Sequence, residues 1–216
     1  MIAIVDGTNA PALWNNVTFT VLDNAPSEVV GATFVTDFKK HLFFAKADKL
    51  TFTAPYTDND FTAASGAGSI SVGGSVTGLM VFREQLIIFT ETAIYQLSGN
   101  TIADFQLKPI TTDVGCIDTD TIQEVGGDIM FLGPEGLRLL GGTERIGDFG
   151  LGVVSKKIQN QMTELITNNQ SFASIVIRGK SQYRIFGYSA NITKENAQGI
   201  LGTQFSGQGG DNMAWA

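Results

Sequence analysis

Few side chains that carry common enzyme or metal chemistry occur in this sequence of 216 residues. The one cysteine, Cys116, excludes an internal disulfide bond. The one histidine, His41, excludes a metal site built from several histidines, and any Ser-His-Asp triad would depend on it. His41 lies in an apolar run typical of a strand, and Cys116 has no cationic sequence neighbour that would lower its pKa. We therefore expect an ordinary strand histidine and a reduced, partly buried thiol.

Positive charge and long apolar runs are also scarce. Fourteen basic and 21 acidic residues give a formal net charge of −7, and basic residues form no cluster beyond pairs such as Lys39-Lys40 and Lys156-Lys157. Because nucleic acid is held by many cations, this balance disfavours direct DNA or RNA binding. No apolar run approaches the roughly 18–20 residues that span a bilayer, and the first residues lack the pattern of a secretory signal. We expect no membrane insertion, and synthesis in a reducing cytoplasm.

The residues that are present favour an all-β protein. Hydrophobic residues make up 43% of the chain, which fits a folded globular protein. Fifteen phenylalanines and many threonines, valines and isoleucines favour strands, and 25 glycines divide the sequence into short segments.

One hydrophobic pattern occurs three times. The copies start at Phe38, Phe82 and Val125, which are 44 and 43 residues apart. Apolar residues follow at offsets +4 and +12, and a turn residue follows at +17. A repeat of roughly 40–50 residues built from short strands is typical of a β-propeller blade, which buries its faces against its neighbours. The residues at these offsets are Leu42, Leu50 and Pro55; Leu86, Ile94 and Gly99; and Ile129, Leu137 and Gly142.

The repeat divides the chain into a leading segment and one propeller domain. Residues 1–31 predict an irregular segment with one strand at 17–22, and residues 32–216 predict the propeller. An exposed strand edge needs a partner, so we expect Trp215 to meet the N-terminal strand or another polypeptide, and the propeller to be incomplete. The expected blades are residues 32–74, 75–116, 118–154 and, as a degenerate copy, 172–216.

Turns and strands within the repeats allow finer predictions. Gly126-Gly127 predicts a two-residue hairpin turn with positive φ, whereas Lys39-Lys40 and Arg83-Glu84 at the same places predict wider turns. Leu79–Phe82 and Leu86–Phe89 are apolar without alternation, which predicts strands covered on both faces.

One segment has helical periodicity, and one loop is unusually long. Apolar residues spaced as on one helix face predict a single short helix at about 154–167, with Ser155 as its N-cap, lying across a blade edge. Tyr56–Ala67 is long for a hairpin loop, which makes it a candidate interaction loop.

Acidic and glycine-rich stretches contain no catalytic or ligand-binding motif. Asp58–Asp60 lacks the downstream glycine and glutamate of a calcium loop, and Asp118 and Asp120 fit a turn before a strand. Residues 66–68 and 207–210 are not followed by the Lys-Ser/Thr and helix of a phosphate loop. The sequence thus predicts no enzyme and no catalytic, cofactor-binding or metal-binding residues, although two carboxylates that converge in space stay possible.

Three stretches together form a recognisable pattern: residues 82–99, 112–116 and 127–141. They resemble the nozzle proteins of short-tailed bacteriophages, the tail tubular protein B group. Asp6–Asn9 and Gln182–Phe186 are similar to that group too, so the resemblance covers most of residues 4–188. The chain is much shorter than the nozzle proteins of this group.

The resemblance implies a structural virion protein that forms a homo-oligomeric ring, a hexamer, in the tail. Such a nozzle joins the adaptor, carries tail fibres and gates the DNA exit channel, where an acidic lumen lets DNA pass without sticking. The protein would be made in the host cytoplasm. Two alternatives stay open: a receptor- or carbohydrate-binding propeller that uses the loop Tyr56–Ala67 and other polar loops, and a hydrolase that depends on His41 or on a particular acidic residue.

Overall fold

The chain folds into antiparallel sheets with one short helix among the described residues, which confirms the all-β prediction. It divides into two compact units, Met1–Asp113 and Val114–Ala216, each of which is considered by itself. Closure of the sheets into a propeller stays a prediction. The structure, a computed structural model, describes residues 1–141, 153–189, 198–204 and 213–216.

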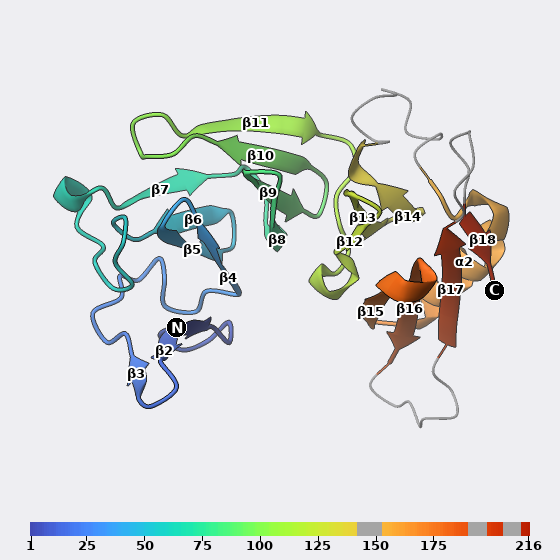
Figure 1. The fold of residues 1–216 in the computed structure, drawn as a ribbon, viewed down its shortest axis with the longest axis horizontal. Coiled ribbons are helices and arrows are strands. Elements are labelled where there is room, and N and C mark those ends of the chain that lie inside the picture. Colours follow the sequence, from blue (N-terminus) through green and yellow to red (C-terminus); the bar gives the residue numbers. More distant parts are fainter. Residues whose placement is uncertain (142–152, 190–197, 205–212) are drawn as a thin grey trace. The chain divides into compact units, whose positions relative to one another are not determined.

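The first unit contains three sheets in which consecutive strands are neighbours (Figure 1). Its N-terminal sheet has three strands where the sequence predicted one, because three short segments rich in apolar residues pair with one another. A 3₁₀ turn, Ala63–Ser65, lies within the predicted interaction loop. The strands are β1 (Ile2–Ile4), β2 (Ala12–Trp14) and β3 (Phe19–Val21) in the N-terminal sheet; β4 (Phe34–Phe38), β5 (His41–Lys46), β6 (Lys49–Phe52) and β7 (Gly68–Ser71) in the first repeat sheet; and β8 (Val76–Phe82), β9 (Gln85–Thr90), β10 (Ile94–Ser98) and β11 (Gln106–Thr111) in the second repeat sheet.

The second unit contains two sheets and the helix α2 (Gln159–Asn168). A 3₁₀ turn at Thr119–Thr121 precedes the third repeat sheet, and another at Arg178–Lys180 joins the first two strands of the fourth sheet. The strands are β12 (Gln123–Val125), β13 (Asp128–Gly133) and β14 (Gly136–Leu139) in the third repeat sheet, and β15 (Ser171–Ile177), β16 (Gln182–Tyr188), β17 (Gln198–Gln204) and β18 (Met213–Trp215) in the fourth sheet.

The repeated sequence pattern corresponds to a repeated strand register. In each copy the residue at offset 0 pairs with the residue at +3 across the first turn, and the residue at +7 pairs with the residue at +12 across the second. Equivalent sequence positions therefore occupy equivalent places in three sheets. The pairs are Phe38–His41, Phe82–Gln85 and Val125–Asp128 at the first turn, and Ala45–Leu50, Phe89–Ile94 and Leu132–Leu137 at the second.

The first turn of every repeat contains two residues with positive φ. Gly126-Gly127 has φ of 60° and 80°, as predicted, but Lys39-Lys40 (46° and 68°) and Arg83-Glu84 (45° and 65°) have the same conformation. The prediction of wider turns is therefore wrong. The twist of paired strands favours this turn, and the strand pairing offsets a cost of about 1 kcal/mol at each non-glycine residue. An ion pair between Lys39 and Glu84 joins the turns of the first two repeat sheets.

Successive sheets within each unit pack with their first strands adjacent: β4 lies against β8, and β12 lies against β15. The core between the first and second repeat sheets is formed by side chains such as Phe43, Leu50 and Leu86. Strand β9 is buried along its apolar run, as predicted, but β8 is only partly covered, since Val81 is 42% exposed. The prediction that β8 is covered on both faces is wrong at that end.

The predicted helix is present, but it begins later than predicted and lacks the predicted N-cap. A 3₁₀ turn at Lys156–Ile158 leads into α2, and Ser155 makes no capping bond because its Oγ accepts a hydrogen bond from the Leu137 N–H at 3.1 Å. The helix contacts β14, the last strand of the third repeat sheet, and covers the core shared by the third and fourth sheets, where its Met162 and Leu165 are buried.

Trp215 has its partners inside the second unit. It pairs with Gly202 of β17, and its indole N–H donates to the Val154 carbonyl oxygen at 3.1 Å. Strand β1, which the sequence offered as one partner of Trp215, pairs with β2.

Candidate functional site

His41 is the one histidine of the sequence and therefore the one imidazole that could act as a base or a metal ligand. It lies in the core of the first unit. It is 1% exposed, and its Nδ1 lies 2.6 Å from the Thr53 carbonyl oxygen. The rings of Phe43, Phe52 and Phe105 surround the imidazole, with centroids 5.4 to 6.2 Å away. The Nε2 atom has no partner among the described residues. The ring is thus a member of an aromatic cluster and is closed to solvent.

The start of the predicted interaction loop forms a cavity of about 340 Å³ in the first unit. Tyr56 is 78% exposed, and the Lys40 ammonium donates to its hydroxyl at 2.6 Å and lies 4.3 Å from its ring centroid. Tyr56 has φ of 61°, so two strained residues, Lys40 and Tyr56, meet here. Asp37 and Asp58, which have carboxylate side chains, also line the cavity. This site can offer an aromatic ring and charges of both signs.

The acidic triplet Asp58–Asp60 in this loop forms local turns. The Asp60 carboxylate accepts a hydrogen bond from the Thr62 N–H at 2.8 Å, and hydrogen bonds from Thr62 hold the pKa of Asp60 below its usual value. The Asn59 carbonyl oxygen accepts from the Asn24 side chain at 3.1 Å. No group of three or more possible metal ligands occurs in the described part of the chain.

Cys116 and its neighbours form a buried polar cluster in the second unit. The thiol donates to the Asp118 carbonyl oxygen at 3.3 Å, and burial raises its pKa to about 11. Tyr183 is also fully buried, which raises the pKa of its phenol, and its hydroxyl donates to the Thr121 carbonyl oxygen at 2.8 Å. A thiol with a raised pKa is a poor nucleophile, so this cluster is suited to holding two sheets together.

Asp118 and Asp120 join the third repeat sheet to the fourth sheet. The Asp118 carboxylate accepts from the Asp120 N–H at 2.9 Å and from the Phe172 N–H at 3.0 Å. The Asp120 carbonyl oxygen accepts from the Ser174 hydroxyl at 2.6 Å. The turn that these acids predicted is present as the 3₁₀ turn Thr119–Thr121. The sequence did not predict the hydrogen bonds from these two residues to β15.

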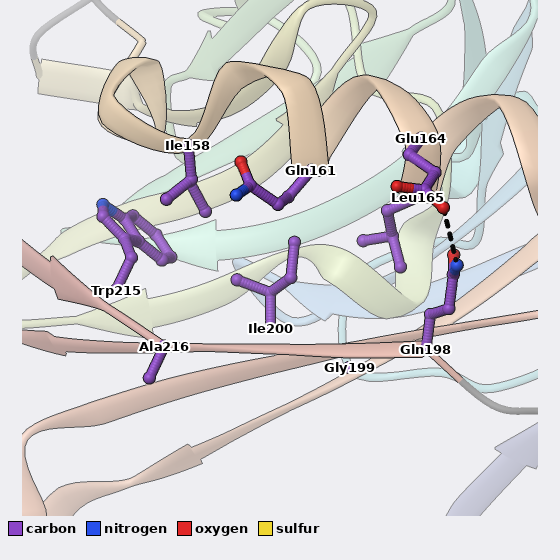
Figure 2. Close-up of a pocket in the computed structure, with 9 residues that line it drawn as sticks. All are labelled: Ile158, Gln161, Glu164, Leu165, Gln198, Gly199, Ile200, Trp215 and Ala216. Carbon is purple, nitrogen blue, oxygen red and sulfur yellow. Dashed lines mark hydrogen bonds between the residues drawn. The ribbon is translucent and has the colours of Figure 1, made fainter.

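A groove of about 410 Å³ lies between α2 and the strands β17 and β18 (Figure 2). Trp215 and Ile158 lie at one end, and Glu164 and Gln198 face each other at the other end, with the Gln198 amide donating to Glu164 at 3.4 Å. Because one end of the groove is apolar and the other is polar, its chemistry fits an amphipathic ligand. No local sequence signal predicts the groove, because it depends on how a helix and two distant strands meet. Its lining residues are Ile158, Gln161, Glu164, Leu165, Gln198, Gly199, Ile200, Trp215 and Ala216.

The N-terminal sheet leaves an apolar face exposed. Strand pairing places Ile2, Trp14 and Phe19 in one row, and Ile4, Ala12 and Val21 in the next. We call these six residues the N-terminal face. No member of the face is charged, and the spacing of two between apolar residues in each strand is a sequence signal that could have predicted it. The most exposed members are Phe19 (58%), Ile2 (55%), Ile4 (43%) and Val21 (43%).

No protein-family model matches the chain, and no curated protein is detectably similar to it in sequence. The nozzle resemblance therefore depends on the sequence stretches described above. Among the described residues, no helix is long and apolar enough to cross a membrane.

Proposed function

We propose that the chain is a structural virion protein of a short-tailed bacteriophage, a subunit of the tail nozzle ring. Its repeated sheets include the segments that resemble nozzle proteins, residues 82–99 and 127–141. The ring would be a homo-hexamer that joins the adaptor, carries tail fibres and gates the DNA exit channel. The net charge of −7 would keep duplex DNA from adhering to its lumen.

The observation that carries an assembly role is the N-terminal face. Monomeric proteins seldom leave the apolar ends of two neighbouring rows of a sheet exposed, because such a face favours association. Four of its side chains, Ile2, Ile4, Phe19 and Val21, are each more than 40% exposed. Because the face is uncharged, copies of an acidic protein would meet there with little repulsion.

Sedimentation and electron microscopy of the purified protein test this proposal. The protein is expected to form rings, and Phe19→Asp is expected to shift it to monomers because each contact would bury a carboxylate without a partner. Ile102→Asp is the matched control, since Ile102 is 49% exposed in the same unit but lies outside the N-terminal face. A strictly monomeric wild-type protein that never enters virions would overturn the proposal.

The second candidate is a receptor- or carbohydrate-binding role, which the exposed Tyr56 favours. Sugar rings pack on aromatic faces, and the neighbouring Asp37 and Asp58 could accept hydrogen bonds from hydroxyls. Binding to a glycan array that is lost in Tyr56→Ala and retained in Phe19→Ala would support this role. Absence of binding to any glycan would count against it.

A further inference from the structure

The outer face of the fourth sheet combines exposed aromatic rings with positive charge. Burial alternates cleanly along β16: Tyr183 and Ile185 point into the core, whereas Arg184, Phe186 and Tyr188 point outward. Phe186 is 41% exposed and Tyr188 is 43% exposed. We call the outward-facing residues of β15 to β18 the outer face.

We propose that the outer face binds single-stranded nucleic acid, with the Phe186 and Tyr188 rings as stacking platforms for two bases and Arg184 as a phosphate ligand. The two aromatic residues are separated by one residue on a strand with neighbours on both sides, so their rings are spaced by about 7 Å along the sheet. Sheets that recognise RNA stack successive unpaired bases on aromatic side chains in this way. Bases in a duplex are stacked on each other and cannot reach such rings.

Glycine at position 199 helps hold the first platform. Phe186 pairs with Gly199 on β17, and a Cβ at Gly199 would lie 2.8 Å from the Phe186 Cδ1. The phenyl ring therefore lies across the glycine, close to the sheet. Its other side is open to a base.

Charge on the outer face opposes the charge of the whole chain. Strand register places no aspartate or glutamate among the described outward-facing residues, although the chain has 21 acidic residues. Arg184 lies within the face, and exposed Arg178 and Lys180 lie in the turn between β15 and β16. Arg178 forms an ion pair with Glu124 of β12 at 3.9 Å, which leaves Arg184 and Lys180 as the cations available to the outer face. Because salt screens charges beyond about 10 Å, this local cationic surface can attract phosphates despite the net charge of −7.

The charge of Arg184 favours a nucleic acid over a protein as the partner of the outer face. Its guanidinium donates one hydrogen bond, to the Gln182 side chain at 2.9 Å, and its Nε is buried and has no partner in the described part of the chain, so a phosphate would be bound by the terminal nitrogens. A protein sheet that packed on Ile175 and Leu201 would bury this charge unpaired, at a cost of several kcal/mol. A phosphate would neutralise it. The inference goes beyond the proposed assembly role and does not depend on it.

Fluorescence anisotropy with a labelled oligothymidine of about twelve nucleotides tests the proposal. We expect a dissociation constant on the order of 10⁻⁵ M at physiological salt, and weaker binding of a duplex of equal length. Phe186→Ala and Tyr188→Ala should each weaken binding about tenfold, the effect of one lost stacked base, whereas Tyr188→Phe should retain it. Phe19→Ala and Tyr56→Ala are the matched controls, since they remove exposed aromatic rings elsewhere and should leave binding unchanged.

The salt dependence gives an independent measurement. Two cations, Arg184 and Lys180, predict a slope of about −1.4 for log K against log salt, and Lys180→Gln should reduce its magnitude by about 0.7. No binding at low salt would overturn the proposal. So would unchanged affinity in both Phe186→Ala and Tyr188→Ala, or inorganic polyphosphate that competes as well as the oligonucleotide. Oligomeric mass measured on the same samples separates this result from that of the assembly proposal.

Discussion

The N-terminal sheet and the fourth sheet each leave one face exposed, but the two faces differ in chemistry. The N-terminal face is apolar and uncharged, with Phe19 as its most exposed member. The outer face of the fourth sheet has rings of similar exposure, Phe186 and Tyr188, but places Arg184 beside them. Exposed area alone therefore does not define a partner. An uncharged apolar face is best covered by another apolar face, whereas rings with a cation match bases and phosphates.

The largest expected effect is a loss of folding stability when a charge is placed on the inner face of a sheet in the second unit rather than on its outer face. Leu137 is fully buried in the core between its two sheets, whereas Ile175 is 53% exposed on the outer face. Leu137→Asp should lower the free energy of unfolding by several kcal/mol, because the carboxylate would be buried without a partner. Ile175→Asp, the control, should change it by less than about 1 kcal/mol. Urea titration of both variants measures the difference, and equal stabilities would show that the sheet faces are assigned wrongly.

Alkaline pH should lower the free energy of unfolding of this unit by a smaller amount, through the buried thiol of Cys116. Burial raises the pKa of Cys116 from 9.0 to about 11, so the unfolded chain loses the thiol proton first as pH rises. This contribution to stability is fully present below pH 9 and is lost between pH 9 and about 11, with a loss on the order of 1 kcal/mol by pH 10. Cys116→Ala should be less stable at neutral pH and should lose less stability over this interval. Denaturation curves at pH 8 and 10 check this, and an identical pH dependence in both proteins would contradict it.

The smallest expected effect is a loss of oligonucleotide affinity, without a loss of stability, when the position of an aromatic ring on the outer face is changed. In Gly199→Ala the new methyl group would meet the Phe186 ring and move it off the sheet. Oligothymidine affinity should fall a few-fold, while the melting temperature should change little because both residues are at the surface. Gly179→Ala is the matched control, since a Cβ there would have no atom within 4 Å. Unchanged affinity in Gly199→Ala would show that ring position is not important.

Much of the fold could be predicted because it is encoded by periodic local patterns. Offsets from Phe38, Phe82 and Val125 predict equivalent strand positions, and the structure places these residues in one shared register. Helix α2 was predicted from its apolar spacing in the same way. The turn at Lys39-Lys40 was predicted wrongly, because strand twist and pairing determine φ there more strongly than the preference of lysine.

The candidate sites were harder to predict because they depend on contacts between distant residues. The sequence places Phe186 and Tyr188 on one side of a strand, but it does not show that this side is exposed and free of acidic residues. The groove under α2 needs Ile158 and Trp215 together, 57 positions apart in the sequence. Ser155 fits a capping position by residue type, yet its hydroxyl binds the Leu137 N–H, a long-range contact that no local rule contains.

The difference between the two exposed faces is tested most directly by sedimentation velocity of the protein mixed with a labelled oligothymidine. Protein absorbance reports self-association, and the label reports bound nucleic acid. We expect Phe19→Asp to sediment as a monomer that still carries the oligonucleotide, and Phe186→Ala to self-associate as the wild type does but to carry little of it. Loss of both properties together in either variant, with the fold intact, would contradict the assignment of different partners to the two faces.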